Sequence, residues 1–320
     1  MVKIALAPAS SELAREIIDV LVATGKHEIV ALVRRDPTQF PSLPGVTWVQ
    51  TDYQDKAELV RLFNGVEVVL SFIPVHLDIG NAIQKRLIDA SIEAGVKRFA
   101  PSEWSCGTQL ESVLGAIPWY TGKVEVAQYL EDLNQDKKVI EYTRFHPGGF
   151  MNYLAHPHKS TSHVTTFNFL IDFESQNAQV IEGSLDSVVA LTTVQDIAGV
   201  VARAVEFKGE WPVIGGIAGS RITIGELLKL GDAIGRPFKI QWLKGEDLEA
   251  IEYKPEIYVG VDLRNALPEQ AGKFLQMALN GMLLSMSRGI YDVTDEWNKL
   301  LPDYKFTQTE DFIKKYWGGK

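Results

Sequence analysis

The chain has 320 residues, 46% of them apolar, and a formal net charge of -9 at pH 7, so it can bury a large core. The negative charge argues against nucleic acid as a partner, because clustered Lys and Arg carry that kind of binding, and it favours a small-molecule ligand. No apolar run approaches the roughly 20 residues that span a bilayer, so we expect no membrane insertion, no secretion and a cytoplasmic location.

Short β-branched runs alternate with helical stretches through the first half of the chain, which is typical of a parallel sheet covered on both faces. The predicted strands are Lys3–Ala7, Glu28–Val33, Thr47–Gln50, Val66–Phe72, Arg98–Pro101 and Val139–Arg144. The predicted helices are Ser11–Thr24, Lys56–Phe63, Ile79–Ala94 and Gly122–Leu133. This pattern predicts an α/β fold with a doubly wound, six-stranded Rossmann sheet.

The turn between the first strand and the first helix stands where a dinucleotide-binding unit carries three glycines. Counted from the strand, those positions hold Pro8, Ser11 and Ala14. Proline lacks an N–H donor, so one phosphate contact is lost. The amides and hydroxyls of Ser10 and Ser11, together with the positive helix N-terminus, can still bind a phosphate. Glu12 is unfavourable in such a turn unless its carboxylate points outward.

After Phe150 the alternating pattern ends. Residues Asn152–Thr166 are rich in Ser, Thr and Pro, which predicts an irregular segment that could act as a lid. A helix at Val194–Glu206 is expected to pack back on the sheet, and the remaining predicted elements are helices at Ile222–Ile234 and Pro268–Arg288 and a strand at Phe238–Leu243. We therefore predict a Rossmann domain over residues 1–150, joined by about 189–206, and a smaller, interleaved substrate domain over 151–320.

The segment after Phe150 holds His156, His158 and His163. A proline lies between the first two, and no carboxylate stands at a fixed helical spacing, so we predict no metal site. Cys106 is the single cysteine, which excludes an internal disulfide, and no activating base lies near it in sequence. The chain also has no nucleophile elbow and no P-loop.

Several motifs in this order resemble the isoflavone reductase and NmrA-like branch of the atypical short-chain dehydrogenases, particularly its fungal members. The motifs are Leu32-Val33-Arg34-Arg35, Thr51-Asp52-Tyr53, Lys97-Arg98-Phe99-Ala100-Pro101-Ser102-Glu103-Trp104, Lys123, Thr143-Arg144-Phe145-His146-Pro147-Gly148-Gly149-Phe150 and Phe306-Thr307-Gln308-Thr309-Glu310-Asp311-Phe312-Ile313. The resemblance implies an NADPH-binding Rossmann domain and a cleft between it and a smaller C-terminal domain.

Arg34 and Arg35 end the second strand about twenty residues beyond the turn, where an arginine accommodates the 2′-phosphate of NADP. Because of these arginines, NADPH is the predicted cofactor. The alternative is that the two arginines pair with Asp36 or Asp52. The predicted cofactor-binding residues are Pro8, Ser10, Ser11, Arg34, Arg35, Asp52, Tyr53, Ile73, Pro74, Lys123 and Phe145.

Lys123 opens a predicted helix, where a lysine without other context would be a solvated side chain. The resemblance implies that it lies beside the nicotinamide, binds the ribose and acts as general acid or base. A partly buried lysine releases its proton more readily, so it could protonate an oxyanion formed by hydride addition. Tyr120 precedes it by three residues, and we do not assign Tyr120 the role of the tyrosine in ordinary short-chain dehydrogenases.

Two polar motifs follow the fifth and sixth strands, at the sheet edge where doubly wound folds bind ligands. His146 could assist Lys123 in catalysis, because imidazole exchanges a proton near neutral pH, and a buried, hydrogen-bonded histidine is the alternative. Trp104 and Trp119 could stack on an aromatic substrate or simply pack. The predicted substrate residues are Ser102, Glu103, Trp104, Tyr120, Gly148, Phe150 and Tyr153.

The leading hypothesis is an NADPH-dependent reductase of a small aromatic or polyketide-like metabolite, a monomer or homodimer that transfers hydride to a carbonyl or a conjugated double bond. Two alternatives stay open. One is a regulatory protein that senses NADP(H) without turnover. The other is a cofactor-independent isomerase or cyclase, which the turn without glycines favours.

Overall fold

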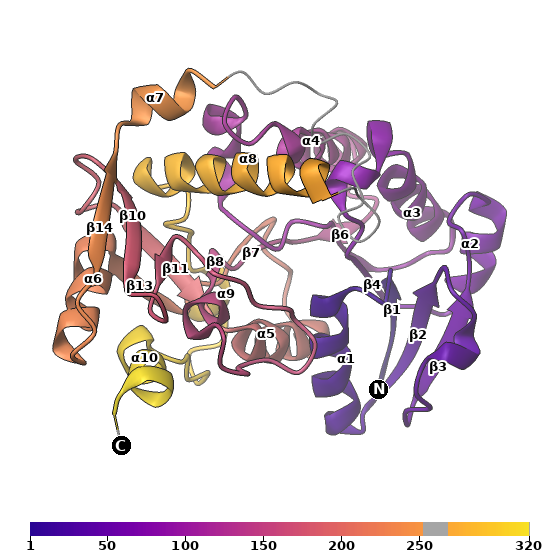
Figure 1. Cartoon of the computed structure of the whole chain (residues 1–320). Helices are drawn as coiled ribbons and strands as arrows, with labels where there is room; N and C mark the ends of the chain where they lie inside the picture. Colours follow the sequence, from indigo (N-terminus) through magenta and orange to yellow (C-terminus); the bar gives the residue numbers. More distant parts are fainter. Residues whose placement is uncertain (252–267, 320) are drawn as a thin grey trace.

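The computed structural model describes residues 1–251 and 268–319 (Figure 1). Its largest sheet has six strands in the order β3-β2-β1-β4-β5-β6, and every neighbouring pair is parallel. The strands are β1 (Val2–Ala7), β2 (His27–Val33), β3 (Val46–Gln50), β4 (Val68–Ser71), β5 (Arg98–Ala100) and β6 (Glu141–Tyr142). This order is that of a doubly wound sheet, which confirms the predicted fold class.

Helices cover both faces of this sheet, and the side chains of β1 show why. Ile4 and Leu6 belong to one apolar cluster with α1 and α5, whereas Ala5 and Ala7 belong to a second cluster with α2, α3 and α4. The alternation follows from the two-residue period of a strand. The helices are α1 (Glu12–Thr24), α2 (Lys56–Leu62), α3 (Ala82–Glu93), α4 (Thr121–Asn134) and α5 (Val194–Glu206).

The first helix begins and ends at the residues expected from its sequence. Ser11 is its N-cap and accepts a hydrogen bond from the Ala14 amide at 3.2 Å. Gly25 closes it in the left-handed conformation, with φ 65°. Helix α5 packs against α1 although 169 positions separate Thr24 from Thr193, the N-cap of α5 (193 − 24). Figure 1 shows the two helices side by side. Residues of α5 share one apolar cluster with Ile4 and Leu6 of β1, so α5 packs on the sheet as predicted.

The predicted strand Val139–Arg144 is wrong in extent. Asn134 accepts the amides of Val139 and Ile140 with its side-chain oxygen at 2.8 and 3.2 Å, so strand pairing begins only at Glu141. The Arg144 amide then donates to the carbonyl of Val213 at 2.9 Å, and the chain leaves the large sheet. It continues as β7 (Arg144–His146), which pairs with β12 (Ile214–Gly216).

The second half of the chain forms two smaller sheets. One has the order β13-β11-β8 and the other β14-β10-β9. Their strands are β8 (Gly149–Phe150), β9 (Ile171–Asp172), β10 (Asn177–Ile181), β11 (Val188–Thr192), β13 (Ser220–Thr223) and β14 (Lys239–Leu243). The helices are α6 (Ile224–Ala233), α7 (Gly245–Glu249), α8 (Pro268–Ser287), α9 (Glu296–Leu300) and α10 (Thr309–Trp317).

Two predicted helices begin later than expected. The helix predicted from Ile222 starts at Ile224, because residues 220–223 pair as β13 and Thr223 forms a capping box with Glu226. The helix predicted from Ile79 starts at Ala82, because Gly80 and Asn81 both have positive φ. Across residues 1–251 and 268–319, no helix is long and apolar enough to cross a membrane.

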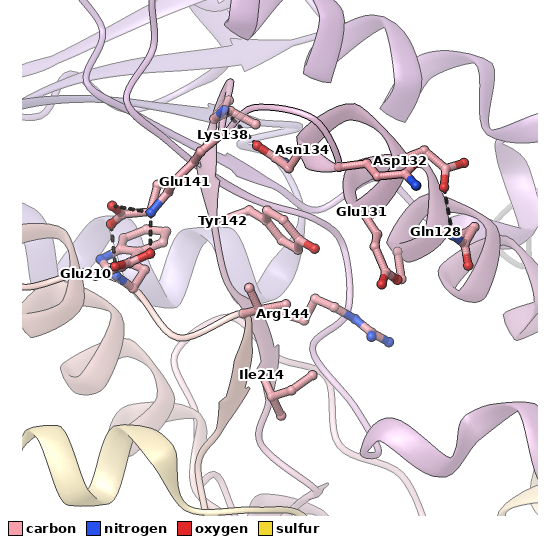
Figure 2. Close-up of a pocket in the computed structure, with 15 residues that line it drawn as sticks. Gln128, Glu131, Asp132, Asn134, Lys138, Glu141, Tyr142, Arg144, Glu210 and Ile214 are labelled. Carbon is pink, nitrogen blue, oxygen red and sulfur yellow. Dashed lines mark hydrogen bonds and ion pairs between the residues drawn. The ribbon is translucent and has the colours of Figure 1, made fainter.

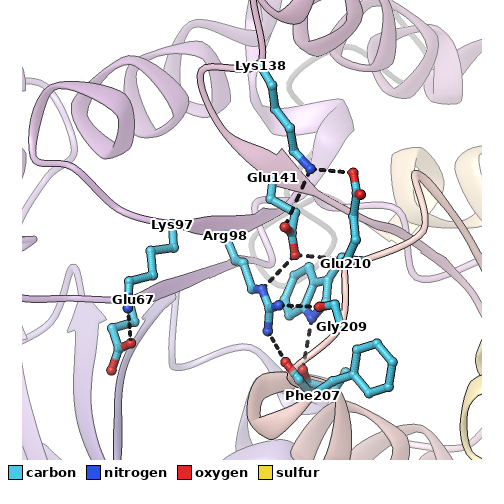
Figure 3. Close-up of polar contacts among 10 residues, drawn as sticks. Glu67, Lys97, Arg98, Lys138, Glu141, Phe207, Gly209 and Glu210 are labelled. Atoms are coloured by element: carbon cyan, nitrogen blue, oxygen red, sulfur yellow. Dashed lines mark hydrogen bonds and ion pairs between the residues drawn. The ribbon is translucent and has the colours of Figure 1, made fainter.

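A half-buried arginine, Arg98, binds the end of α5 to the sheet, as Figure 3 shows. Arg98 donates from Nε to Glu141 at 2.7 Å and from its terminal nitrogens to the carbonyls of Phe207 and Gly209, each at 2.6 Å. Lys138 also lies 3.5 Å from Glu141. The segment after α5 is therefore held at β5 and β6, and α5 stays on the sheet next to α1.

Candidate cofactor and substrate site

Two backbone hydrogen bonds hold the turn that lacks glycines, one to β2 and one within the turn. The Ala9 amide donates to the carbonyl of Leu32 at 2.8 Å, and the Ser11 amide donates to the carbonyl of Pro8 at 3.2 Å. The next two amides, of Glu12 and Leu13, stand in the first turn of α1 and have no acceptor within the helix. These two amides and the positive helix end are what the turn offers to a phosphate.

The carboxylate of Glu12 is held away from the turn by a neighbouring segment. It accepts hydrogen bonds from the amide and hydroxyl of Thr165, at 3.0 and 2.7 Å. Thr165 lies in the irregular segment predicted after Phe150, which follows the short helix η6 (Met151–Ala155). The carboxylate of Glu12 is therefore bound by Thr165, and its direction relative to a bound phosphate stays a prediction.

Residues 161–166, which we call the strap, are bound to α1 by further acidic side chains of that helix. One oxygen of Glu16 accepts three consecutive backbone amides, from residues 162, 163 and 164, at 2.8, 2.7 and 3.2 Å. His163 Nε2 lies 2.7 Å from a carboxylate oxygen of Asp19. Glu12, Glu16 and Asp19 are spaced four and three residues apart, so they share one face of α1. The strap is irregular, as predicted, and it is bound to the helix that follows the turn.

Both arginines that follow β2 are exposed, and each guanidinium lies over an aromatic ring. Arg34 Cζ lies 5.6 Å from the ring centroid of Tyr53, and Arg35 Cζ lies 5.1 Å from that of Phe40. Within the described residues, neither guanidinium pairs with a carboxylate. Asp52 instead accepts the amide of Gln54 at 2.8 Å, so both arginines remain available to a phosphate.

The remaining predicted cofactor residues differ in how far they are buried. Tyr53 is fully buried, and its hydroxyl donates to the Leu32 carbonyl at 2.9 Å. Phe145 is also fully buried, with its ring stacked between those of Trp104 and Trp297. Ile73 is buried and Pro74 is partly exposed. Tyr53, Phe145 and Ile73 thus contribute side chains to the core beneath the sheet edge, and any contact with a cofactor stays a prediction.

Lys123 is buried in the first turn of α4, with 5% of its surface exposed. Its Nζ donates to the backbone carbonyl of Glu103 and lies 3.9 Å from the ring centroid of Tyr120. Tyr120 ends the short helix η5 (Pro118–Tyr120), and the change from η5 to α4 brings its ring against Nζ. An ammonium with a carbonyl on one side and an aromatic face on the other is fixed in position.

A buried ion pair lies next to Lys123. Glu103 accepts a hydrogen bond from Arg144 Nε at 2.8 Å, and His146 Nε2 lies 3.8 Å from its other oxygen. Burial alone would raise the pKa of Glu103, but His146, Arg144 and Lys123 outweigh that effect and lower it to about 2. The carboxylate of Glu103 is therefore ionised, and it lies beside the guanidinium of Arg144 and the side chain of Lys123.

His146 is fully buried, and among the described residues neither of its ring nitrogens has a hydrogen-bond partner. The structure places it beside Glu103, while the residue that contacts Lys123 through its ring is Tyr120. Its predicted part in proton transfer stays a prediction.

Packing accounts for the positions of several predicted substrate residues. Trp104 stacks between Phe72 and Phe145, at 4.7 and 5.1 Å, and donates from Nε1 to the Ser71 carbonyl at 2.7 Å. The Ser102 amide donates to the side chain of Gln84 at 2.9 Å, and Ser102 is buried. Gly148 has φ 72°, and a Cβ there would collide with the carbonyl of Ala190.

A group of hydroxyls near Lys123 includes two residues that the sequence did not reveal. The Tyr120 hydroxyl lies 3.3 Å from Ser105 Oγ, and Tyr291 is buried close to both. Ser105 directly follows the motif at residues 97–104, so its place in the sequence could have identified it as a candidate site residue. Tyr291 follows α8, far along the chain, and has no local signal at all.

The three histidines after Phe150 have separate neighbours. His156 Nδ1 lies 3.2 Å from Thr166 Oγ1, the ring of His158 lies 4.5 Å from that of Trp317, and His163 is bound to Asp19. In the part of the chain that the structure describes, no group of three or more metal-ligating side chains comes together.

A separate groove of about 660 Å³ lies between α4, β6 and β12 (Figure 2). None of the predicted cofactor or substrate residues lines it. Within it Lys138 contacts Glu141 and Glu210, and the amide of Gln128 donates to Asp132 at 2.8 Å. Arg144 lines it as well, and its Nε is directed to Glu103. We therefore place the candidate site at Lys123 rather than in this groove.

Comparison with known proteins identifies the family and the fold of the chain. The family model described as NmrA-like family matches residues 2–312. The oxidoreductase swnN of Metarhizium robertsii is 22% identical over 339 residues, which cover 99% of this chain and 98% of that protein.

Two solved structures are similar over nearly the whole length. The NADPH-dependent quinone oxidoreductase of Escherichia coli in complex with NADPH has a TM-score of 0.68 at 22% identity, covering 98% of this chain and 99% of that one. The structure of AtPrR2 with NADP+ and (+)pinoresinol has a TM-score of 0.71 at 18% identity, covering 98% of each chain. At these identities the two structures show a shared fold.

Proposed function

The chain belongs to the NmrA-like family, and from that premise we propose that it is an NADPH-dependent reductase of a small aromatic or polyketide-like metabolite, acting on a carbonyl or a conjugated double bond. The observation that carries the proposal is Lys123, a buried ammonium at the edge of the sheet where ligands bind doubly wound folds. The related proteins support the reductase class, since one is named an oxidoreductase and two were solved with NADPH or NADP+.

The residues around the turn fit NADPH. The first-turn amides of α1 would hold the pyrophosphate, and a contact from the hydroxyl of Ser10 is part of the same proposal. Arg34 and Arg35 are exposed and unpaired among the described residues, which suits the 2′-phosphate. NADPH, when bound, supplies the hydride.

Lys123 is the residue placed to take part in the proton transfer. One of its three N–H bonds points to the carbonyl of Glu103, which leaves donors for a ribose hydroxyl and for a substrate oxygen. The ionised Glu103 is itself paired with Arg144, so the Lys123 charge is left to stabilise an oxyanion. A cytoplasmic location and a monomeric or homodimeric state belong to the same proposal.

Calorimetry with NADPH and NADH, followed by NADPH oxidation with a panel of aromatic ketones, quinones and enones, tests the proposal. We expect NADPH to bind more tightly than NADH and Lys123→Gln to lose most turnover, with Lys85→Gln as the control on a neighbouring helix. Tight binding without turnover would favour a sensor of NADP(H). Conversion without any coenzyme would favour an isomerase or cyclase, and no binding of either coenzyme would exclude the reductase.

A further inference from the structure

We propose that the groove between α4, β6 and β12 binds an apolar α-amino acid, whose carboxylate is held by Arg144 and whose ammonium group is held by Glu131. None of the residues assigned to the cofactor or the substrate lines this groove, so the proposal goes beyond the reductase function. Because Arg144 also bonds to Glu103, the bound amino acid is linked to the candidate site at Lys123.

The groove has the size and the lining of a site for a small metabolite. Its volume of about 660 Å³ lies within the range of ligand pockets. The lining residues come from α4, from β6 and β7, and from the segment that leads into β12. Val213 in that segment is 46% exposed, so apolar surface is open to solvent there. The apolar lining residues are Ala127, Ile140, Tyr142, Trp211, Val213 and Ile214.

Most of the acidic side chains that line the groove already have partners. Lys138 contacts both Glu141 and Glu210, and Asp132 accepts a side-chain amide at 2.8 Å. Glu131 differs from them, because it is exposed and has no hydrogen bond or ion pair in the described part of the chain. Its carboxylate is therefore available to a cationic group in the groove.

Arg144 has donors that its partner does not use. Its Nε donates to Glu103 at 2.8 Å, and its side chain is 14% exposed. Across residues 1–251 and 268–319, its two terminal nitrogens donate no hydrogen bond. The terminal nitrogens of a guanidinium bind a carboxylate through two parallel N–H bonds. Arg144 is therefore able to hold a carboxylate in the groove while its Nε faces Glu103.

The unused groups lie in the same part of the groove. Figure 2 shows the polar ends of Glu131, Tyr142 and Arg144 directed toward one another, from α4, β6 and β7. Burial raises the pKa of the Tyr142 hydroxyl, Glu131 raises it further and Arg144 opposes the rise, so both charges lie close to this hydroxyl. Glu131 and Arg144 form no ion pair with each other in the described part of the chain. A ligand that carries both charges fits between them.

The charges of the groove select the class of ligand. A simple carboxylate would be attracted by Arg144 and repelled by Glu131, and a simple amine would meet the opposite combination. A zwitterion satisfies both residues, and the Tyr142 hydroxyl donates to its carboxylate. Its side chain then lies on the apolar surface at Val213 and Ile214. Apolar α-amino acids have all three features.

Arg144 connects the groove to Lys123. Its Nε bonds to the side chain of Glu103, and the backbone carbonyl of Glu103 accepts the Lys123 ammonium. A carboxylate on the terminal nitrogens shares the charge of Arg144 with Glu103 and weakens that ion pair. Lys123 contacts the ribose of NADPH in the proposed function, on which this link rests. An amino acid in the groove should therefore weaken NADPH binding, and NADPH should weaken amino-acid binding by the same factor.

Calorimetry with three matched ligands tests the site. L-phenylalanine carries both charges, 3-phenylpropionate lacks the ammonium group and 2-phenylethylamine lacks the carboxylate. We expect each of the two partial ligands to bind about tenfold more weakly than L-phenylalanine. The contribution of Arg144 is measured with 2-phenylethylamine rather than by substitution, because Arg144 also supports Glu103. Equal affinities for the three ligands, or no heat with L-phenylalanine at millimolar concentration, would overturn the proposal.

Two variants with the same change in charge assign the ammonium group to Glu131. Glu131→Gln should lower the affinity for L-phenylalanine about tenfold without weakening 3-phenylpropionate, which has no ammonium group. Asp136→Asn is the control, since Asp136 is exposed just after α4 and does not line the groove. It should bind L-phenylalanine as the wild-type protein does. Equal losses in both variants would show that net charge alone matters, which contradicts the site.

Titration of NADPH tests the link to Lys123. With saturating L-phenylalanine, we expect the Kd for NADPH to rise about fivefold. An unchanged Kd would overturn the link, and the three matched ligands would still decide whether the groove binds an amino acid. Failure of the wild-type protein to bind NADPH would end the reductase proposal, while the same three ligands would still test the groove.

Discussion

Arg144 donates from Nε to Oε1 of Glu103 across 2.8 Å, and the two side chains are 14% and 3% exposed. Glu103 in turn accepts the Lys123 ammonium on its backbone carbonyl. Glu103 therefore forms an ion pair through its side chain and positions Lys123 through its backbone carbonyl. Substitutions of Arg144 should therefore alter the position of the Lys123 side chain, through Glu103.

The pH dependence of stability should report the ionisation of Glu103. Its pKa is lowered from 4.5 to about 2 in the folded protein, so its stabilisation is complete above pH 4.5 and is lost as the pH falls toward 2. We expect Glu103→Gln to lower the free energy of unfolding by about 3 kcal/mol at neutral pH, and the difference from wild type to shrink as the pH falls through that window. Urea unfolding at several pH values measures it. A difference that is constant with pH would contradict the assignment.

Arg144→Met should be strongly destabilising, because it removes the guanidinium that donates to the buried carboxylate of Glu103 at 2.8 Å. We expect a loss of about 3 kcal/mol in the free energy of unfolding. Arg203→Met is the control, since Arg203 and Asp303 form an exposed pair with side chains 45% and 65% exposed. Its loss should stay below about 1 kcal/mol. Similar losses in both variants would show that Glu103 does not depend on Arg144.

Arg34→Ala should weaken NADPH binding about tenfold and leave NADH binding unchanged, because only NADPH carries the 2′-phosphate. Isothermal calorimetry gives both constants. Arg61→Ala is a suitable control, since Arg61 is exposed on α2 and lies 3.9 Å from Asp55. An equal loss for NADH and NADPH would remove Arg34 from the 2′-phosphate site.

Glu16→Ala should release the strap from α1. Three backbone amides then lose a charged acceptor, and we expect the free energy of unfolding to fall by about 2 kcal/mol. Hydrogen exchange at residues 162–164 should become faster, whereas Asp19→Asn, which removes only an exposed contact with His163, should change it little. Unchanged protection in Glu16→Ala would mean that the strap is held by other contacts.

Periodic elements were the part of the fold that could be predicted. The six strands and helix α5 follow from apolar alternation and helical periodicity, and Val194–Glu206 has the predicted bounds. The late start of β6 could not be predicted. The side chain of Asn134 accepts the amides of Val139 and Ile140, and such a contact leaves no trace in the pattern of apolar residues. The strand before α6 was missed although Thr223 and Glu226 form a readable capping box.

The site divides in the same way. Lys123 could be found from the resemblance, and the two arginines that follow β2 could be found from the resemblance and from their place after a strand. The partnership of Lys123 with Tyr120 could not, because it depends on the change from η5 to α4. Tyr291 reaches the site from beyond α8, and only the tertiary fold brings it to Ser105.

The packing of α5 against α1 limits how the chain can be divided. A fragment that ends at residue 150 would keep every strand of the parallel sheet and lose the helix that covers Ile17 and Leu21. Such a fragment would expose the apolar face of α1 to water, and we expect it to aggregate when produced by itself. Deleting the intervening residues and joining α5 to the fragment through a short linker would restore the cover of Ile17 and Leu21.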